Sequence, residues 1–580
     1  MPRFAALDVG SNALRLRIIE ASAPSSTWAR AADRAQLPLL VTEKESPTGW
    51  RELLSLRAPV RLGSEVFVTG RLAPQSIGQA CAALRQFRDA MDQLGVDAYR
   101  ATATSAVREA QNGATLVERA RREARIELEV IEGVEEARLI QLAVVRRLKL
   151  EDRRAMLLDV GGGSTELTFL DRGQGTFAMS LSLGTVRLLE TFLASPRKRG
   201  REGGAQVLGR VDRERLKLIG ETVDRALAEA LPHIKRASEM LVGTGGNVET
   251  LADLCPVRGG LGSGLPSRAI DVTAMRALIG KMAAMTTEER RTTYSLRPDR
   301  ADTIVPAAMI FLKAAQAFRV SHVTVPGAGL KEGILEELVD KYFDVWDEAG
   351  EAKSVLAACR RLGSRYSFDE RHAELVSRFA TQLFDDLQPV HAFTARDRLL
   401  LQAAALLHDI GDYVRYDGHH KHSHYLIMHA EILGLLPEER AVVANIARYH
   451  RKSAPDIDHP NFRELDKVSR GKVRGLSAML RIADALDREH RGKVREVRAE
   501  LDGATPPRKV ALVLGGTQDR ELEEWSVGHK SELFRDVFDL DVQVMRAEKE
   551  ASIPHEPDVA NAETATQAPA AGVPKQKTAS

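Results

Sequence analysis

Two short glycine-centred segments, about 150 residues apart, repeat the same chemistry. The first is Asp8-Val9-Gly10-Ser11-Asn12, and the second is Asp159-Val160-Gly161-Gly162-Gly163-Ser164-Thr165-Glu166. Each follows an apolar stretch, and an apolar stretch that ends in a glycine-rich turn is typical of a buried strand leading into a loop. The repeat therefore predicts two similar halves, each of which presents one such loop.

The side chains in these turns are suited to holding phosphate. Glycine lets the main chain approach a phosphoryl oxygen closely, and hydroxyl groups add hydrogen-bond donors. A carboxylate would repel the phosphate itself, so we expect Asp8 and Asp159 to hold a divalent cation beside it. The candidate phosphate-binding residues are Gly10, Ser11, Asn12, Gly161, Gly162, Gly163, Ser164 and Thr165.

The overall composition limits the classes of protein to consider. A chain of 580 residues is too long for one hydrophobic core, and roughly three or four domains are expected. The 83 Lys and Arg residues nearly balance the 81 Asp and Glu residues, so the net charge does not indicate a nucleic-acid-binding protein. The three cysteines are far apart and form no C-x-x-C motif, which argues against a disulfide framework or a thiolate metal site. We therefore expect the protein to be located in a reducing cytoplasm. No apolar run approaches the roughly 18 residues of a membrane span, so we expect no membrane partner.

Strand and helix signals alternate twice along the first part of the chain. We expect strands at 4–7, 14–19 and 97–102 with a helix around 77–94, then strands at 156–158, 166–170 and 240–242 with a helix around 214–230. This alternation predicts an α/β fold, with one lobe over residues 1–130, a second over 131–345, and a cleft between them.

The rest of the chain has a different character. After about residue 347 a helical periodicity rich in Ala, Leu and Arg predicts an all-helical domain over 350–500. Alternating apolar residues at 509–514 and 540–545 predict a small α+β segment over 501–545. Residues 546–580 contain no aromatic residue, and we expect a disordered tail there.

Two carboxylates and one arginine are candidates for chemistry between the loops. Glu135 and Glu136 lie at the start of a helix that continues through Leu148. Acidic residues in a first helical turn are favoured by the helix dipole, but one of them could instead be a general base that deprotonates a water for attack on a terminal phosphorus. Arg108 follows a strand, and its guanidinium would suit a phosphoryl group, although a solvated surface position is the alternative.

Six motifs in this order resemble the exopolyphosphatase and guanosine pentaphosphate phosphohydrolase family, a branch of the actin, sugar kinase and Hsp70 fold class. They lie at residues 7–12, 57–63, 103–110, 133–139, 158–167 and 327–333. The resemblance implies two actin-like lobes, Glu136 as the catalytic base, Arg108 in contact with the terminal phosphate, and Asp159 and Glu166 at a metal site. Glu135 could share the role of base, and the resemblance makes the turn at 243–247 structural.

The family reaction implied is stepwise release of orthophosphate from the end of inorganic polyphosphate, usually with Mg2+. Some members remove the 5′ terminal phosphate of guanosine pentaphosphate, and longer members are regarded as homodimers. Three alternatives stay open: guanosine pentaphosphate hydrolysis in the same cleft, a sensor that binds polyphosphate or guanosine penta- or tetraphosphate without turnover, and an ATP-dependent kinase or chaperone of the same fold class.

The predicted helical domain carries a second candidate site. His408-Asp409 lies at the end of an apolar helix, with His372 before it and Asp484 after it, an order that resembles the HD phosphohydrolase domain and implies one divalent ion. Further histidines and cations at 418–424 and 449–452 add metal-binding potential. The alternative is a decayed HD fold whose histidines pack and line a path for polyphosphate. A basic run at 197–201 could attract a polyanion or be a solvated loop.

Overall fold

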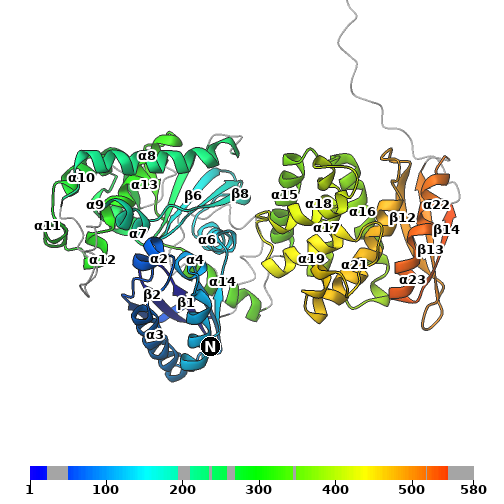
Figure 1. The fold of residues 1–580 in the computed structure, drawn as a ribbon, viewed down its shortest axis with the longest axis horizontal. Helices are drawn as coiled ribbons and strands as arrows, with labels where there is room; N and C mark the ends of the chain where they lie inside the picture. Colours follow the sequence, from blue (N-terminus) through cyan, green and yellow to red (C-terminus); the bar gives the residue numbers. More distant parts are fainter. Residues whose placement is uncertain are drawn as a thin grey trace, which may run out of the picture.

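The computed structural model describes residues 1–22, 50–193, 210–233, 238–257, 268–343, 348–516 and 519–546. Figure 1 shows two parts: a two-lobed α/β module, and a helical domain that ends in a small sheet. The basic run at 197–201 and almost all of the predicted tail lie outside the described residues.

The sheet of the first lobe has the order β3-β2-β1-β4-β5. The central strand β1 (Arg3–Val9) pairs antiparallel with β2 (Leu14–Glu20) and parallel with β4 (Ala98–Ala103). The edges are β3 (Arg51–Ala58) and β5 (Leu128–Val130). Apolar side chains of β1 are buried, as expected for a strand covered on both faces.

The sheet of the second lobe repeats this arrangement and adds one edge strand, in the order β10-β11-β9-β6-β7-β8. Its central strand β6 (Arg154–Val160) pairs antiparallel with β7 (Thr165–Asp171) and parallel with β9 (Met240–Gly245). The other strands are β8 (Gln174–Leu181), β10 (Ala269–Asp271) and β11 (His322–Thr324). Since the two glycine turns follow the equivalent strands β1 and β6, the duplication and the predicted α/β, actin-like fold class are confirmed.

Helices cover both sheets. In the lobes they are α2 (Gly63–Thr69), α3 (Pro74–Gln93), α4 (Ser105–Glu109), α5 (Gly113–Arg119), α6 (Gly133–Arg147), α7 (Thr185–Leu188), α8 (Arg213–Ala230), α9 (Val248–Leu254), α10 (Val272–Ala283), α11 (Thr287–Thr293), α12 (Pro298–Ala301), α13 (Ile304–Ala317) and α14 (Leu330–Phe343). The predicted strands and helices of this region are all present, with bounds that differ by a few residues.

A helix pair joins the two lobes. Helices α6 and α14 pack together, and their apolar residues form one buried cluster with residues from both central strands, including Phe4 of β1 and Leu157 of β6. The backbones of the two helices come very close, since a Cβ atom at Gly333 would lie 1.9 Å from the carbonyl oxygen of Leu139. This packing fixes α6, and therefore its first turn, relative to both lobes.

The helical domain contains α15 (Glu348–Arg365), α16 (Glu370–Asp386), α17 (Ala395–Leu407), α18 (His419–Met428), α19 (Pro437–Arg448), α20 (Pro460–Arg463) and α21 (Lys467–Ala485). The closing segment contains β12 (Val494–Leu501), β13 (Lys509–Gly516), α22 (Glu521–Lys530), α23 (Glu532–Phe538) and β14 (Asp541–Arg546), with the sheet order β12-β13-β14.

Strand β12 begins inside the range predicted to be helical. A register shift between Val494 and Glu496 interrupts its pairing with β13, and the buried positions along it do not alternate regularly. The interruption removed the period-2 signal that would have marked a strand in the sequence.

The helical domain is anchored on the two-lobed module. Helix α15 packs against β8, and Val134 of α6 belongs to the core of the helical domain. Arg440 of α19 donates hydrogen bonds to both carboxylate oxygens of Glu132, at 3.0 and 3.2 Å, directly before α6.

Across the described ranges, no helix combines the length and the apolar character that a membrane span requires.

We predict that Gly333→Ala lowers the free energy of unfolding by about 1 to 3 kcal/mol, because the added methyl group must push α14 away from α6. Denaturant unfolding followed by circular dichroism measures the change. The control is Gly280→Ala on α10, where no atom lies within 4 Å of the added Cβ and the helix propensity of alanine favours the variant by up to about 1 kcal/mol. Equal stabilities for the two variants would contradict the tight packing.

Candidate active site

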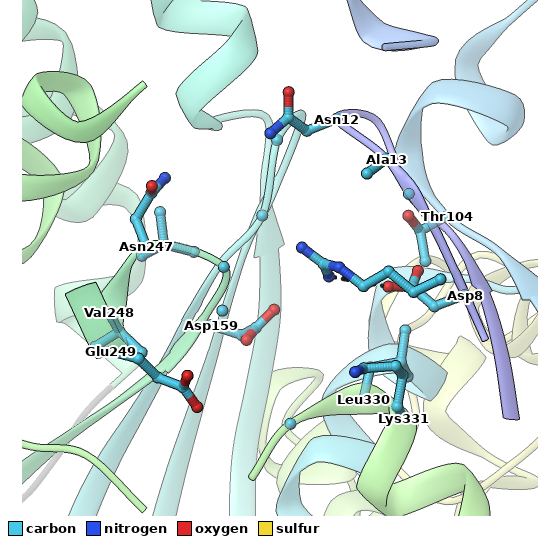
Figure 2. A pocket seen from close by; sticks show the side chains of 18 of the residues that line it. Asp8, Asn12, Ala13, Thr104, Asp159, Asn247, Val248, Glu249, Leu330 and Lys331 are labelled. Atoms are coloured by element: carbon cyan, nitrogen blue, oxygen red, sulfur yellow. Dashed lines mark hydrogen bonds and ion pairs between the residues drawn. The ribbon is translucent and has the colours of Figure 1, made fainter. Parts of the chain in front are cut away.

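A cleft of about 560 Å³ lies between the lobes and is lined by residues of both glycine turns. Asp8, Gly10, Ser11 and Asn12 contribute from the first lobe; Asp159, Gly161, Gly162 and Ser164 contribute from the second. Figure 2 shows Asp8 and Asp159 pointing into this pocket from opposite sides, with Lys331 at its edge. The two predicted loops therefore face one cleft.

The loops also touch each other. A Cβ atom at Gly162 would lie 2.9 Å from Cβ of Ser11, so only glycine lets the second turn come this near to the first. The hydroxyl of Ser11 is 2.9 Å from the hydroxyl of Ser105, at the start of α4, and the amide of Gly63 donates to the carbonyl of Ser11 at 2.8 Å. The first turn is thus held by α4 and α2.

Three buried carboxylates meet beside the second turn. Glu136, Asp159 and Glu166 each place one oxygen within 4.8 Å of the others. Antiparallel pairing of β6 with β7 sets Asp159 directly opposite Glu166, and the first turn of α6 brings Glu136 to them. The Oε2 atoms of Glu136 and Glu166 are buried and accept no hydrogen bond within the described structure.

Burial and mutual repulsion disfavour the charged forms of these three groups. Burial raises the pKa of Glu136 well above its ordinary value, and the charges of Glu166 and Asp159 raise it further. Burial and Asp159 raise the pKa of Glu166 to about 7. Burial also raises the pKa of Asp159 to about 6, although Thr244 donates a hydrogen bond to its carboxylate. An ion that neutralised the cluster would remove this cost.

The donor set fits a divalent cation. Buried carboxylate oxygens, two of them without hydrogen-bond partners, are the ligands preferred by hard ions such as Mg2+. Asp8 is outside this group of three. It faces them across the cleft, and its carboxylate accepts from Arg15 at 3.2 Å, its antiparallel pairing partner on β2.

The two adjacent glutamates have different surroundings. Glu136 lines the cleft, whereas Glu135 lines a separate pocket between α6, α14 and the helical domain. The carboxylate of Glu135 accepts hydrogen bonds from Arg138 at 2.7 Å and from Arg100 at 3.0 Å, and these cations help to lower its pKa. The prediction that Glu135 could share the role of base is therefore not supported, because its side chain is engaged on the other face of the helix.

Arg108 lines a third pocket, which adjoins the cleft at Ser164. Its guanidinium donates to the carbonyl of Ile131 at 2.6 Å. Burial and the neighbouring carboxylates raise the pKa of Glu136 and Glu166, and the charge of Arg108 offsets part of that rise, so Arg108 acts on the same buried group of acids. The predicted contact with a terminal phosphate would take place at this junction.

Three of the predicted site residues, Gly163, Thr165 and Glu166, do not line the cleft themselves. They lie in the turn and strand directly behind it.

Several cations of the cleft were not predicted from the sequence. Arg15, Arg57, Arg297, Arg300 and Lys331 line it. Arg300 is buried, which lowers its pKa to about 9, and it donates to the Asn247 side chain at 3.1 Å. Asn247 belongs to the turn at 243–247, which was expected to be structural but lines the cleft. Arg15 lies on β2, Arg57 on β3 and Lys331 on α14. The others, Arg297, Arg300 and Asn247, come from short loops and a four-residue helix, where no periodicity marks their position.

The candidate residues of the helical domain also come together. His372, His408 and Asp484 form one buried group, and Asp409 lies beside them, with Oδ2 3.3 Å from Nε2 of His408. His419 and His450 join the same cluster through Asp409. The sequence had marked these two histidines only as part of basic, histidine-rich segments.

Comparison with known proteins identifies the family. Residues 41–342 match the Ppx/GppA phosphatase family, and residues 356–530 match the family described as Ppx/GppA phosphatase, domain III. The chain is 24% identical over 497 residues to the guanosine-5'-triphosphate,3'-diphosphate pyrophosphatase of Aeromonas hydrophila, and the alignment covers 83% of this chain and 87% of the relative. It is 27% identical over 344 residues to exopolyphosphatase 1 of Mycobacterium leprae, and this alignment covers 59% of this chain and 91% of the relative.

Among solved structures, a Ppx/GppA family member from Aquifex aeolicus is 27% identical, covers 59% of this chain and 98% of its own, and has a TM-score of 0.44. The first family match alone spans more than half of the 580 residues. The resemblance inferred from the six motifs is thus confirmed, and the chain belongs to the Ppx/GppA phosphatase family.

Proposed function

We propose that this protein is an exopolyphosphatase, which releases orthophosphate stepwise from the end of inorganic polyphosphate. The observation that carries the proposal is the position of Glu136, which is buried beside the two facing glycine turns and next to Asp159 and Glu166. Phosphatases of this family act on phosphoanhydride bonds, and a polyphosphate chain ends in such a bond. The cations along the cleft supply a path for the rest of the anionic chain.

In this mechanism the two turns hold the terminal phosphoryl group through their main chain and the hydroxyls of Ser11 and Ser164. Glu136 takes the proton of a water that attacks the terminal phosphorus in line with the leaving phosphate. Burial raises the pKa of Glu136 above its ordinary value, which makes its carboxylate a stronger proton acceptor than that of an exposed glutamate. The guanidinium of Arg108 offsets the negative charge that develops on the transferred group.

Asp159 and Glu166 would hold the divalent ion that phosphatases of this family generally use, with Asp8 facing it across the cleft. We propose Mg2+ as that ion; when bound, it neutralises phosphoryl oxygens and makes the phosphorus more electrophilic. A homodimer located in the cytoplasm, with neither nucleic acid nor membrane as partner, stays a prediction from the sequence.

A second candidate substrate is guanosine pentaphosphate, hydrolysed at the same place. The cleft continues past the glycine turns to Asn247 and Glu249, which are polar groups that a nucleoside could contact. The relative from Aeromonas hydrophila carries the name of this activity. The rates of orthophosphate release from long-chain polyphosphate and from guanosine pentaphosphate, measured with the same preparation, decide between the two. Release from neither substrate would favour a regulator that binds without turnover.

We predict that Glu136→Gln lowers kcat by about 10² to 10⁴-fold for whichever substrate is used, because the amide cannot accept the proton of the attacking water. The matched control is Glu135→Gln at the adjacent position. Its carboxylate is paired with Arg100 and Arg138, so its loss should reduce stability but leave kcat within a few-fold of the wild type. Equal losses of kcat in two folded variants would contradict the assignment of Glu136.

We predict that the metal-free protein loses stability as pH rises from about 4.5 to about 7 through the titration of Glu166. Its folded-state pKa is raised, so the folded state holds this proton more tightly than the unfolded state does. The stabilisation that this proton provides is complete below the pKa of Glu166 in the unfolded state. It is lost as the pH rises through the pKa of Glu166 in the folded state. The Tm of the lobes in Glu166→Gln minus that in the wild type should therefore be larger at pH 8 than at pH 5. Glu288→Gln, at an exposed position, is the control, and the same Tm difference at both pH values would refute the prediction.

A further inference from the structure

Arg187 belongs to the second lobe, but its side chain meets the first lobe beside the glycine turns. It lies on α7, which follows β8 and packs against α2 of the first lobe (Figure 1). Arg187 is in neither glycine turn and does not line the cleft. Its side chain is half-buried, with 22% of its surface exposed. Any part that it plays in the candidate active site is therefore indirect.

The guanidinium of Arg187 makes three contacts. Nε donates to the carbonyl of Gly163 in the second turn at 2.8 Å, and Nη2 donates to both carboxylate oxygens of Glu109 at 2.7 Å. Cζ lies 4.2 Å from the centre of the Phe67 ring on α2. A Cβ atom at Gly163 would lie 2.2 Å from Cζ of Phe67, so this ring lies directly against the turn as well. Arg187 thus joins the second turn to two helices of the first lobe, α2 and α4.

The ion pair with Glu109 bears on Arg108. Glu109 directly follows Arg108 and is the last residue of α4, a helix of only five residues. So short a helix has little stability of its own, and its end must be held by contacts from outside. Arg187 supplies such a contact on one side of Arg108, and the bond from Arg108 to the carbonyl of Ile131 supplies another.

The second turn is held through its carbonyl groups. The main-chain amides of α7 donate to the carbonyls of Gly161 and Gly162, at distances from 2.8 to 3.1 Å. The carbonyl of Gly163 comes next along the turn, and its donor is the side chain of Arg187. Three successive carbonyls therefore face α7.

Carbonyls that face α7 direct the amides of the turn the other way. In a trans peptide the N–H points opposite to the C=O, so the amides of Gly162, Gly163 and Ser164 point away from α7. None of these three amides donates to an acceptor in the described part of the chain. Successive main-chain amides without partners form a concavity that suits an anion. Arg187 holds the last peptide of this series.

We propose that Arg187 is a positioning residue of the candidate active site. It fixes the peptide between Gly163 and Ser164 so that the Ser164 amide is available to the terminal phosphoryl group. Through Glu109 it also holds Arg108 toward that group. One guanidinium thereby aligns phosphate-binding donors from both lobes. This role rests on the proposed function, because it concerns the same terminal phosphoryl group.

Orthophosphate release from polyphosphate in the presence of Mg2+ tests this role. Arg187→Ala should lower kcat by about 10²-fold, the loss expected when groups at a reacting centre are misplaced. Arg187→Lys should restore little, because one ammonium group cannot replace a planar fork that meets a carbonyl and a carboxylate together.

Arg154→Ala is the matched control. Arg154 pairs with Glu239 at 2.7 Å, at the opposite end of β6 from the second turn, so its loss should leave kcat unchanged. The same kcat in Arg187→Ala as in Arg154→Ala would overturn the proposal.

Added guanidinium separates positioning from a loss of folding. At concentrations that do not lower the Tm, it should raise the rate of Arg187→Ala several-fold and leave the wild type unchanged. Circular dichroism checks that the variant is folded. A rate that falls only together with the Tm, and that guanidinium does not raise, would give Arg187 a purely structural role and overturn the proposal.

The partner of Arg187 provides a second variant at an exposed position. Glu109→Gln should lower kcat less than Arg187→Ala does, because the bond to Gly163 remains. The double variant should be no slower than Arg187→Ala alone, since both changes break the same ion pair. Losses that add independently would overturn the link from Arg187 to Arg108.

A binding measurement separates this role from the proposed reaction. Isothermal titration calorimetry of Glu136→Gln with tripolyphosphate and Mg2+ needs no turnover. Adding Arg187→Ala should raise the Kd about tenfold, and adding Arg154→Ala should not change it. A wild type that releases no orthophosphate, together with binding that depends on Arg187, would refute the reaction and leave the role of Arg187 in place. Unchanged or absent binding would overturn that role.

Discussion

The antiparallel pairing of β6 with β7 is the constraint on which the candidate active site depends. It places Asp159 opposite Glu166 at the end of the central strand of the second sheet, where both residues are buried. Helix α6 then adds Glu136 to the same buried volume. Three acidic groups that repel each other in this way raise the energy of the empty site, and a cation with a bound anion relieves that repulsion.

The duplicated lobes explain why the site lies where it does. Each central strand ends in a glycine turn, and the shared packing of α6 and α14 brings these two ends together. The helical domain takes part as well, because Arg440 holds Glu132 at the base of α6 and Val134 is part of the core of that domain. The orientation of the candidate base is thus fixed by both lobes and by the helical domain.

Much of this could be predicted from the sequence, since apolar strands bounded by glycine turns and long helical periods are local signals. The two turns and the repeated lobes were predicted from such signals, and Glu136 was singled out as the candidate base from the motifs. The separation of Glu135 from Glu136 could not be predicted, because both lie in one helical turn and only tertiary packing shows that one faces Arg100 and the other the cleft. Arg300 comes from a four-residue helix and Asn247 from a short turn, and the clustering of His419 and His450 with Asp409 appears only when the ends of several helices meet.

The most direct test of the central claim is a crystal structure of Glu136→Gln with Mn2+ and polyphosphate, using the anomalous scattering of manganese. The account predicts an anomalous peak bound by Asp159 and Glu166, with the last phosphoryl group between Ser11 and Gly162 and residue 136 facing its phosphorus. A chain end bound elsewhere, with neither metal nor phosphate between the two turns, would contradict it.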